Sequence, residues 1–212
     1  VAATLPLLEP TSNTIGSDAF ALVWTKGELF GLNGSGASPR ALNADAVKNA
    51  GFSKVPFSGW LSVTVPGAPS AWAELNRRFG SMSLEELFAP AIEHAEHGFP
   101  LSTNTAKMWI KETPRFLKEY KNNPNPYKPW VDMYTKDGAP YSAGEIFKSE
   151  QYANTLRELA RTNCESFYSG DLMRKIVKFS RETGGFFCEE DFTSHRCEWT
   201  KPISTNYKGY DV

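Results

Sequence analysis

The sequence predicts an α+β fold in which helices outnumber strands. Residues 19–25 place Phe20, Leu22 and Trp24 at alternate positions, which fits a pleated strand. The Lys26–Gly27 pair that separates them from a second predicted strand over 28–32 is typical of a tight hairpin turn. Residues 84–97 instead repeat apolar side chains every three or four positions, which favours an amphipathic helix. With 212 residues, 41% of them hydrophobic, the chain has the length and apolar content of one ordinary domain with a core.

The charge and hydropathy of the chain give no support to nucleic-acid or membrane partners. Lys and Arg number 23 against 24 Asp and Glu, so no excess charge would attract a polyanion. The longest apolar run is far short of a bilayer span. Lysines between Lys107 and Lys136 are mixed with aromatic residues, but acidic residues within and beside that stretch dilute their charge, which favours a solvated face.

Both ends of the chain carry apolar or strand-forming sequence. Val1 to Leu8 is typical of the end of a buried helix, and Tyr207 to Val212 of a strand that is just starting. An element that stops there would leave surface unpaired. We therefore expect residues 1–212 to form a single incomplete domain, with partner sequence missing at both ends.

A loop of small residues, Asn33 to Ser38, follows the hairpin and is closed by Pro39. Its sequence is NGSGAS, so few side chains shield the backbone. Two interpretations remain open. The loop is either a flexible connection, or a segment that lets a small ligand or another stretch of backbone approach closely.

The next elements are a strand and a helix. Residues 43–58 have no clear period and are expected to be irregular or partly helical. Trp60 to Val65 is rich in β-branched residues and predicts a strand that ends at Pro66–Gly67. Pro69 to Phe79 predicts a helix that ends at Gly80.

A second helix is predicted from a capping box. The Ser83 hydroxyl can accept the amide of the third helical residue while Glu86 reaches back, and the helix is expected to run to His97. Pro90 lies inside it and predicts a kink or break. Its predicted buried stripe consists of Leu84, Leu87, Phe88, Ala91, Ile92 and Ala95.

The second half of the chain is predicted to be largely helical. Residues 102–120 predict a helix interrupted by Pro114. Residues 121–145 hold four prolines and many polar residues, which indicates a long irregular loop. Helices are also predicted over 151–163 and 171–183.

The C-terminal part is expected to hold only short elements. Gly184–Gly185 ends the last long helix, and residues 190–192 begin a short element. Residues 195–212 alternate in the manner of strands.

Two pairs of residues, one of two histidines and one of a histidine and a cysteine, are candidate chemical groups. His94 and His97 lie three apart on one helix, but a metal site needs a third ligand and none is indicated, so no metal is assigned. His195 and Cys197 could pair as base and thiol only if the segment is extended, and a catalytic role is not favoured. We therefore assign no catalytic residue within this chain.

Cofactor motifs are absent and the cysteines do not define a framework. The Asn33 loop lacks the Lys-Ser/Thr that a phosphate-binding loop needs after its glycines, and GxGxxG does not occur, so no cofactor is expected. Cys188 and Cys197 could form a disulfide that leaves Cys164 over, or all three could be free thiols.

Several short motifs, in order along nearly the whole chain, resemble those of γ-glutamyltransferases and their acylase relatives. The motifs are Leu8–Pro10, Ile15–Phe20, Val65–Gly67, Leu87–Ile92, Gly98–Ser102, Phe167–Gly170, Gly184–Gly185, Glu190–Phe192, Pro202–Ile203 and Tyr207–Tyr210. The resemblance implies an N-terminal nucleophile hydrolase with a four-layer αββα sandwich built by two subunits.

That family's precursor cuts itself, and the freed N-terminal Thr of the small subunit attacks an amide with its own amino group as base. The resemblance implies that this chain is most of the large subunit. Its partner would be the small subunit of the same precursor, which carries the nucleophile, and its substrate a small amide.

One departure from the family pattern concerns substrate recognition. True γ-glutamyltransferases carry an Arg after the hairpin that pairs with the α-carboxylate of the γ-glutamyl group, and alignment on Pro39 puts Ser35 at that position. Serine has no charge and offers one hydroxyl in place of the two parallel N–H donors of a guanidinium. Bidentate recognition of the carboxylate is therefore lost, at a cost of about 2–5 kcal/mol for a buried pair. The loop resembles the acylase and amidohydrolase branch, although that branch often has Arg where this chain has Ala37.

Three functions follow from the resemblance. The first is an amide hydrolase or acylase in which Asn33, Gly34 and Ser35 line the acyl-side pocket. The second is a true γ-glutamyltransferase or glutathione hydrolase, in which Arg40 reaches back or the small subunit supplies a cation. The third is a catalytically silent homologue that acts as a binding protein.

Overall fold

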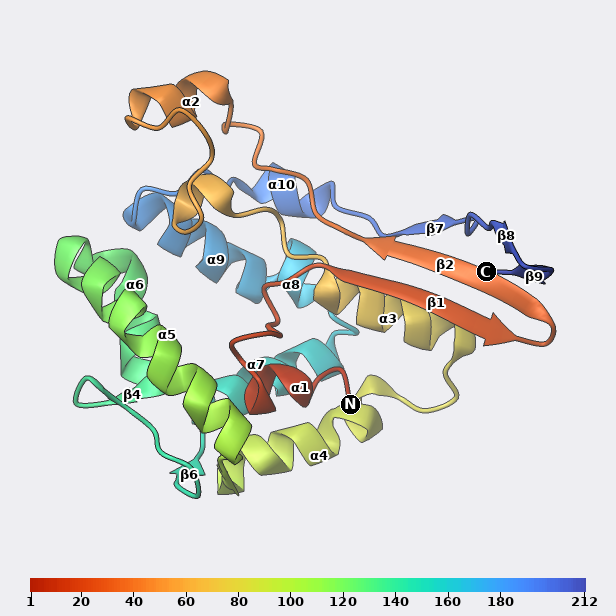
Figure 1. The fold of residues 1–212 in the computed structure, drawn as a ribbon, viewed down its shortest axis with the longest axis horizontal. Coiled ribbons are helices and arrows are strands. Elements are labelled where there is room, and N and C mark those ends of the chain that lie inside the picture. Colours follow the sequence, from red (N-terminus) through yellow and green to blue (C-terminus); the bar gives the residue numbers. More distant parts are fainter.

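The computed structural model describes residues 1–212, and helices dominate it (Figure 1). The α-helices are α1 Leu5–Leu8, α2 Ala44–Asn49, α3 Ala68–Phe79, α4 Leu84–His97, α5 Thr103–Asn122, α6 Pro124–Tyr134, α7 Glu150–Arg161, α8 Ser166–Ser169, α9 Asp171–Glu182 and α10 Glu189–Thr193. The strands are β1 Ala19–Thr25, β2 Glu28–Gly34, β3 Phe99–Pro100, β4 Thr135–Lys136, β5 Ala139–Pro140, β6 Ile146–Phe147, β7 Glu198–Thr200, β8 Asn206–Tyr207 and β9 Tyr210–Asp211. The predicted α+β class is confirmed.

The main sheet has three antiparallel strands in the order β1-β2-β7. Helix α3 lies along one face of the sheet (Figure 1). The opposite face of β1 is open, because Phe20, Leu22 and Trp24 are each 70% exposed while the residues between them are half-buried. The sheet therefore has one covered face and one apolar face without a partner in this chain.

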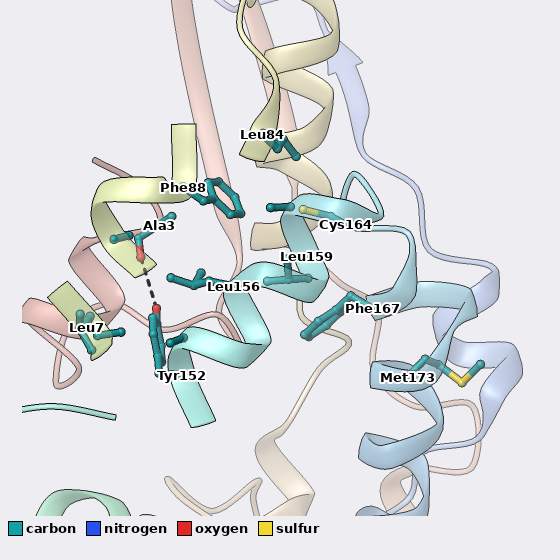
Figure 2. Packing of buried hydrophobic residues seen from close by; sticks show 14 of the residues in the cluster. Ala3, Leu7, Leu84, Phe88, Tyr152, Leu156, Leu159, Cys164, Phe167 and Met173 are labelled. Atoms are coloured by element: carbon teal, nitrogen blue, oxygen red, sulfur yellow. Dashed lines mark hydrogen bonds between the residues drawn. The ribbon is translucent and has the colours of Figure 1, made fainter. Parts of the chain in front are cut away.

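The helical body packs beside the sheet. Helices α4 and α7 pack against each other, α5 against α6, and α8 against α9 and α10. Figure 2 shows the core between α1, α4, α7 and α8, in which Leu156 and Leu159 are fully buried. Tyr152 donates a hydrogen bond of 3.4 Å to the carbonyl oxygen of Ala3 and so joins the N-terminal segment to this core. The buried helix end predicted at residues 1–8 is confirmed only over Leu5–Leu8, where Leu7 is 2% exposed, whereas Val1 is 93% exposed.

The predicted capping box is present at the start of α4. Ser83 Oγ accepts the amide of Glu86 at 3.2 Å, and the Glu86 carboxylate accepts the amide of Ser83 at 2.8 Å. These bonds satisfy two donors that the helix start would otherwise leave unpaired. Of the predicted stripe, Leu87 is 41% exposed and does not join the core, which is a correction.

The strand predicted over Trp60–Val65 is wrong. Trp60–Ser62 form a single 3₁₀ turn instead. The Trp60 indole donates to Thr183 Oγ1 at 3.0 Å, and its ring contacts Phe187 edge-on. This tertiary anchoring of Trp60 overrides the strand propensity of the β-branched residues that follow it.

α4 and α5 run through Pro90 and Pro114, so the interruption predicted at Pro114 is absent, and of the kink or break predicted at Pro90 the break is absent. Both prolines are exposed. The carbonyl groups that lose an intrahelical partner there can bind water, while the opposite face of each helix stays packed.

The irregular loop predicted over residues 121–145 is also wrong, since it contains α6 and the small β4–β5 hairpin. Pro124 is the first residue of α6, where a missing N–H costs no helical hydrogen bond. The Trp130 ring stacks on Phe116 of α5 with ring centroids 3.9 Å apart. Packing against α5 thus holds a helix that the proline content argued against.

The C-terminal segment follows the prediction of short strands, with β7 in the main sheet and β8–β9 as a small hairpin. None of the helices combines the length and the apolar character that crossing a lipid bilayer requires.

Candidate functional site

The candidate site lies where three strand ends of the main sheet meet. β2 ends there, while β1 and β7 begin (Figure 1). Asn33 on β2 pairs with Phe20 on β1 and with Glu198 on β7. Residues directly opposite in an antiparallel pair share a face, so the side chains of Asn33 and Glu198 lie on the open face with Phe20.

The side chain of Asn33 shapes the loop that follows. Asn33 Oδ1 accepts hydrogen bonds from the Ser35 amide at 2.9 Å and from Ser35 Oγ at 2.8 Å. This Asx turn occupies the side-chain oxygen Oδ1 of Asn33 and leaves the side-chain nitrogen Nδ2 as a donor toward the open side. Ser35 is exposed next to it. The structure thus brings Asn33, Gly34 and Ser35 together as one small polar rim.

The glycines of the loop are required by contact with another backbone segment. A Cβ on Gly36 would lie 1.6 Å from the carbonyl oxygen of Val65, and a Cβ on Gly67 would lie 1.6 Å from that of Gly34. The Val65 amide also donates to the carbonyl of Ala37 at 2.9 Å. The interpretation that another backbone approaches this loop is therefore confirmed, and the flexible connection is wrong.

The start of β1 holds the same loop from the other side. The Gly36 amide donates to Asp18 Oδ1 at 2.9 Å. The carbonyl of Ser17 accepts the amides of Gly67 and Ala68 at 3.0 and 2.9 Å. Asp18 and Ser17 thus connect the loop, the Val65–Gly67 segment and the start of α3.

Arg40 is directed toward α10. Its Nη1 lies 2.7 Å from Glu190 Oε1, and its amide donates to Asp191 Oδ1 at 2.9 Å. The Arg40 side chain is 56% exposed, so this ion pair is a surface contact. In this conformation the guanidinium is engaged by α10, and its predicted place in the acyl-side pocket stays a prediction.

A second polar cluster lies beneath Gly34, on the face that α3 covers. Ser70 Oγ lies 2.9 Å from both His195 Nε2 and Cys197 Sγ, and it donates to the Gly67 carbonyl at 2.8 Å. With its own hydrogen so used, Ser70 accepts from the His195 ring and from the Cys197 thiol. Because a Cβ on Gly34 would lie 3.4 Å from Cys197 Sγ, the cluster packs directly under the loop.

The electrostatics of this cluster argue against a thiolate nucleophile. Burial, and then the charge of Arg196, lower the pKa of His195 below its usual value, while Asp18 opposes this. Burial raises the pKa of the Cys197 thiol. Both groups are therefore neutral near pH 7, whereas nucleophilic cysteines need a lowered pKa. A cavity of about 730 Å³ adjoins the cluster, and Glu74, Arg77 and Tyr168 are among its lining residues.

The remaining candidates do not assemble into sites. No group of three or more His, Cys, Asp or Glu residues could hold a metal ion, and the His94 ring packs edge-on against Phe99. The aromatic residues between Lys107 and Lys136 are partly engaged with one another, as in the Phe116–Trp130 stack. All three cysteines are free thiols, so the alternative disulfide between Cys188 and Cys197 does not form.

Comparison with known proteins identifies the family. The sequence profile of the family described as Gamma-glutamyltranspeptidase matches residues 1–212. The Glutathione hydrolase-like YwrD proenzyme of Bacillus subtilis (strain 168) is 32% identical over 216 residues, which cover 100% of this chain and 39% of that relative. The chain belongs to the gamma-glutamyltranspeptidase family. The resemblance seen in the sequence motifs is thereby confirmed.

Solved structures match this chain over nearly its whole length. The crystal structure of cephalosporin acylase from Bacillus halodurans has a TM-score of 0.95 at 46% identity, covering 99% of this chain and 39% of that one. Helicobacter pylori gamma-glutamyltranspeptidase has a TM-score of 0.83 at 25% identity, covering 100% of this chain and 60% of that one. This gamma-glutamyltranspeptidase family chain thus spans about two fifths of the length of the curated relative above.

Within this family member, the sequence indicated part of the rim and missed its neighbours. Asn33 to Ser35 were found through the small-residue loop. Asp18 and Glu198 were missed, because only strand register places them beside that loop. Ser70 carried no signal at all, since it lies 125 residues before His195.

The close backbone contact predicts that Gly36→Ala destabilises the protein by about 2–3 kcal/mol, because the methyl group overlaps the Val65 carbonyl and one segment must move. Urea unfolding of the purified protein measures the change. Gly16→Ala is the matched control, since its Cβ would meet nothing nearer than 3.5 Å. Equal stability of the two variants would show that the loop does not pack as described.

The lowered pKa of His195 predicts a loss of stability at acid pH. Below about pH 6.5 the unfolded chain binds a proton at this histidine before the folded chain does, so the free energy of unfolding falls by at most about 1.4 kcal/mol per pH unit until the folded histidine is also protonated. His195→Gln should flatten this part of the pH dependence of urea unfolding. The same change at the exposed His97 should leave the slope as it is, and a wild-type slope in His195→Gln would contradict the assignment.

Proposed function

We propose that this chain is the large-subunit portion of an amide hydrolase or acylase whose substrates need no carboxylate at the γ-glutamyl position. One observation carries the proposal: the Asn33–Ser35 rim has no free guanidinium. Alignment on Pro39 puts Ser35 where true γ-glutamyltransferases are expected to carry an Arg, and Arg40 is engaged by Glu190. A carboxylate bound there would lack the charged, forked partner that makes such recognition strong.

The relatives support an acylase-type activity without deciding the substrate. The structure at 46% identity is of a protein named cephalosporin acylase. The curated relative at 32% identity is named glutathione hydrolase-like rather than glutathione hydrolase. Both are longer than this chain, so the chemistry of the whole enzyme rests on sequence outside residues 1–212.

The proposed reaction is acyl transfer to water. A Thr at the N-terminus of the small subunit attacks the amide carbonyl, and its α-amino group takes the hydroxyl proton. N–H donors hold the oxyanion that forms. In this scheme the rim of Asn33, Gly34 and Ser35 contributes by binding the acyl side of the substrate, and this chain supplies no group that reacts.

A true γ-glutamyltransferase is the second candidate, and one observation favours it. The Arg40–Glu190 pair is exposed, with side chains 56% and 67% accessible, and such pairs are worth about 0–1 kcal/mol. A substrate carboxylate could therefore compete for Arg40. A catalytically silent homologue is the third candidate, which a missing Thr at the small-subunit junction would support.

The partner is proposed to cover the open face of the sheet. Three large apolar side chains, Phe20, Leu22 and Trp24, are each 70% exposed in a row on β1. A second sheet packed on this face would bury them and complete a sandwich. We propose that the small subunit of the same precursor provides that sheet, and that residues 1–212 are one incomplete domain of the assembly.

The proposed activity predicts a substrate ranking for the assembled two-subunit protein. Hydrolysis of a p-nitroanilide with a neutral acyl group should have a higher kcat/KM than hydrolysis of γ-glutamyl-p-nitroanilide. Arg40→Ala should change both values by less than about twofold, because a surface pair contributes little. Arg174→Ala, which removes a similarly exposed Arg paired with Asp171, is the control. The opposite ranking, abolished by Arg40→Ala alone, would favour the γ-glutamyltransferase.

The proposed partner predicts a second polypeptide in every preparation of the full-length product. Intact-mass and N-terminal analysis should find a chain that begins with Thr. Phe20→Asp should reduce its recovery with the large subunit, because it places a charge in the apolar interface. Phe57→Asp is the control, since Phe57 is 90% exposed, belongs to no strand and has the Arg115 guanidinium of α5 5.6 Å from its ring. Recovery of this chain alone, folded and without a Thr-initiated companion, would overturn the proposal.

A further inference from the structure

The short segment Val65–Gly67 lies against the rim, and two of its carbonyl groups are held by side chains. Tyr168 of α8 donates its hydroxyl hydrogen to the carbonyl oxygen of Pro66 at 2.7 Å. Ser70 of α3 donates from Oγ to the carbonyl oxygen of Gly67 at 2.8 Å. The Tyr168 hydroxyl in turn accepts the Ser70 amide at 3.1 Å, so the two side chains hold neighbouring peptide groups as one unit.

These two bonds act on the part of the segment that meets the rim. A Cβ on Gly67 would lie 1.6 Å from the carbonyl oxygen of Gly34, so the Gly67 backbone abuts the middle residue of the rim. A shift of the Gly67 peptide would therefore push on Gly34 or open a gap beneath it. The position of the rim thus depends on side chains of α3 and α8, on the covered face of the sheet.

The Ser70 hydroxyl also joins the residues before β7 to this unit. His195 Nε2 and Cys197 Sγ each lie 2.9 Å from Ser70 Oγ. Since the hydroxyl hydrogen is used by Gly67, both groups donate to Ser70. The Tyr168 ring stacks on the His195 ring with centroids 5.0 Å apart. Removing this one hydroxyl would leave two side-chain donors without their partner and loosen the hold on Gly67.

The protonation states of this network suit a supporting role. Burial raises the pKa of the Tyr168 hydroxyl and that of the Cys197 thiol, so both keep their protons and remain donors at neutral pH. Burial, and then the charge of Arg196, lower the pKa of His195, which keeps the ring neutral. None of these groups carries the charge of an activated nucleophile, whereas all of them can hold fixed hydrogen bonds.

We propose that Ser70 is a positioning residue, which acts with Tyr168 through the Gly67 backbone to hold the acyl-binding rim where attack by the small-subunit Thr requires it. The inference rests on the proposed function and adds to it a residue on the covered face of the sheet, away from the proposed substrate. When either hydroxyl is lost, the rim shifts and the acyl group is held less accurately, which lowers kcat more than it changes KM.

The experiment compares two neutral substrates on the assembled two-subunit protein. Pentanoyl-p-nitroanilide offers the rim an acyl chain, whereas acetyl-p-nitroanilide ends in a methyl group and offers the rim almost nothing to hold. Ser70→Ala should lower kcat for the pentanoyl substrate about tenfold, with KM within about twofold, because a displacement of less than about 1 Å is enough to impair attack. The kcat for the acetyl substrate should fall less than about twofold. A lower folded fraction alone would reduce both equally.

Three further variants separate positioning from folding. Tyr168→Phe removes the second hydroxyl, keeps the ring that stacks on His195, and should change the pentanoyl-to-acetyl ratio in the same direction. Ser70→Thr should restore the wild-type ratio, since it keeps the hydroxyl and its added methyl group can enter the cavity of about 730 Å³ that Ser70 lines. Ser62→Ala is the matched control, because Ser62 Oγ likewise donates to the carbonyl three residues earlier, that of Gly59, at 3.0 Å, but is exposed and takes no part in the network.

Equal losses for the two substrates, or no loss for either, in Ser70→Ala and Tyr168→Phe would show that the hydroxyls only support the fold. The inference would then be wrong while the proposed function stands. Should Ser70→Ala fail to assemble, Tyr168→Phe decides by the same ratio. If the wild-type protein hydrolyses neither neutral amide, the proposed function fails and the inference fails with it.

Discussion

The contact of two backbone segments without side chains between them is the constraint on which the site depends. Gly36 lies against the Val65 carbonyl and Gly67 against that of Gly34, at distances that leave no room for a Cβ. This contact ties the end of β2 to the start of α3, and Ser17 and Asp18 close it from β1. A rim built in this way is held by rigid elements, which is what substrate positioning requires.

The two faces of the sheet have different roles as a consequence. The face toward α3 carries Trp199, Cys197 and the Ser70–His195 contact, and these groups fix the loop from beneath. The open face carries exposed apolar side chains along β1, Phe20 among them, and polar groups where β2 ends and β7 begins. An exposed apolar area thus lies next to a polar rim on the same face, which fits the proposal that a second subunit completes the site.

Charge at the rim is the basis of the proposed substrate preference. By alignment on Pro39, Ser35 takes the position of the guanidinium expected of a γ-glutamyltransferase, and Arg40 is paired with Glu190 on α10. Carboxylates at Asp18 and Glu198 remain. In the proposed function the same scaffold serves a different acyl group, because family membership fixes the fold, whereas individual side chains at the strand ends set the charge of the rim.

The sequence by itself determined the family, the hairpin, the capping box at Ser83 and the small-residue loop, because these depend on local periodicity and on turn and cap chemistry. Tertiary structure alone decided that Trp60 anchors a 3₁₀ turn instead of a strand and that α6 forms despite its prolines, since packing partners distant in sequence outweigh local propensity. It also decided which groups accompany Asn33. The pairing of Asn33 with Glu198 joins residues far apart in the chain, and strand register is a property of the folded sheet that no local pattern contains.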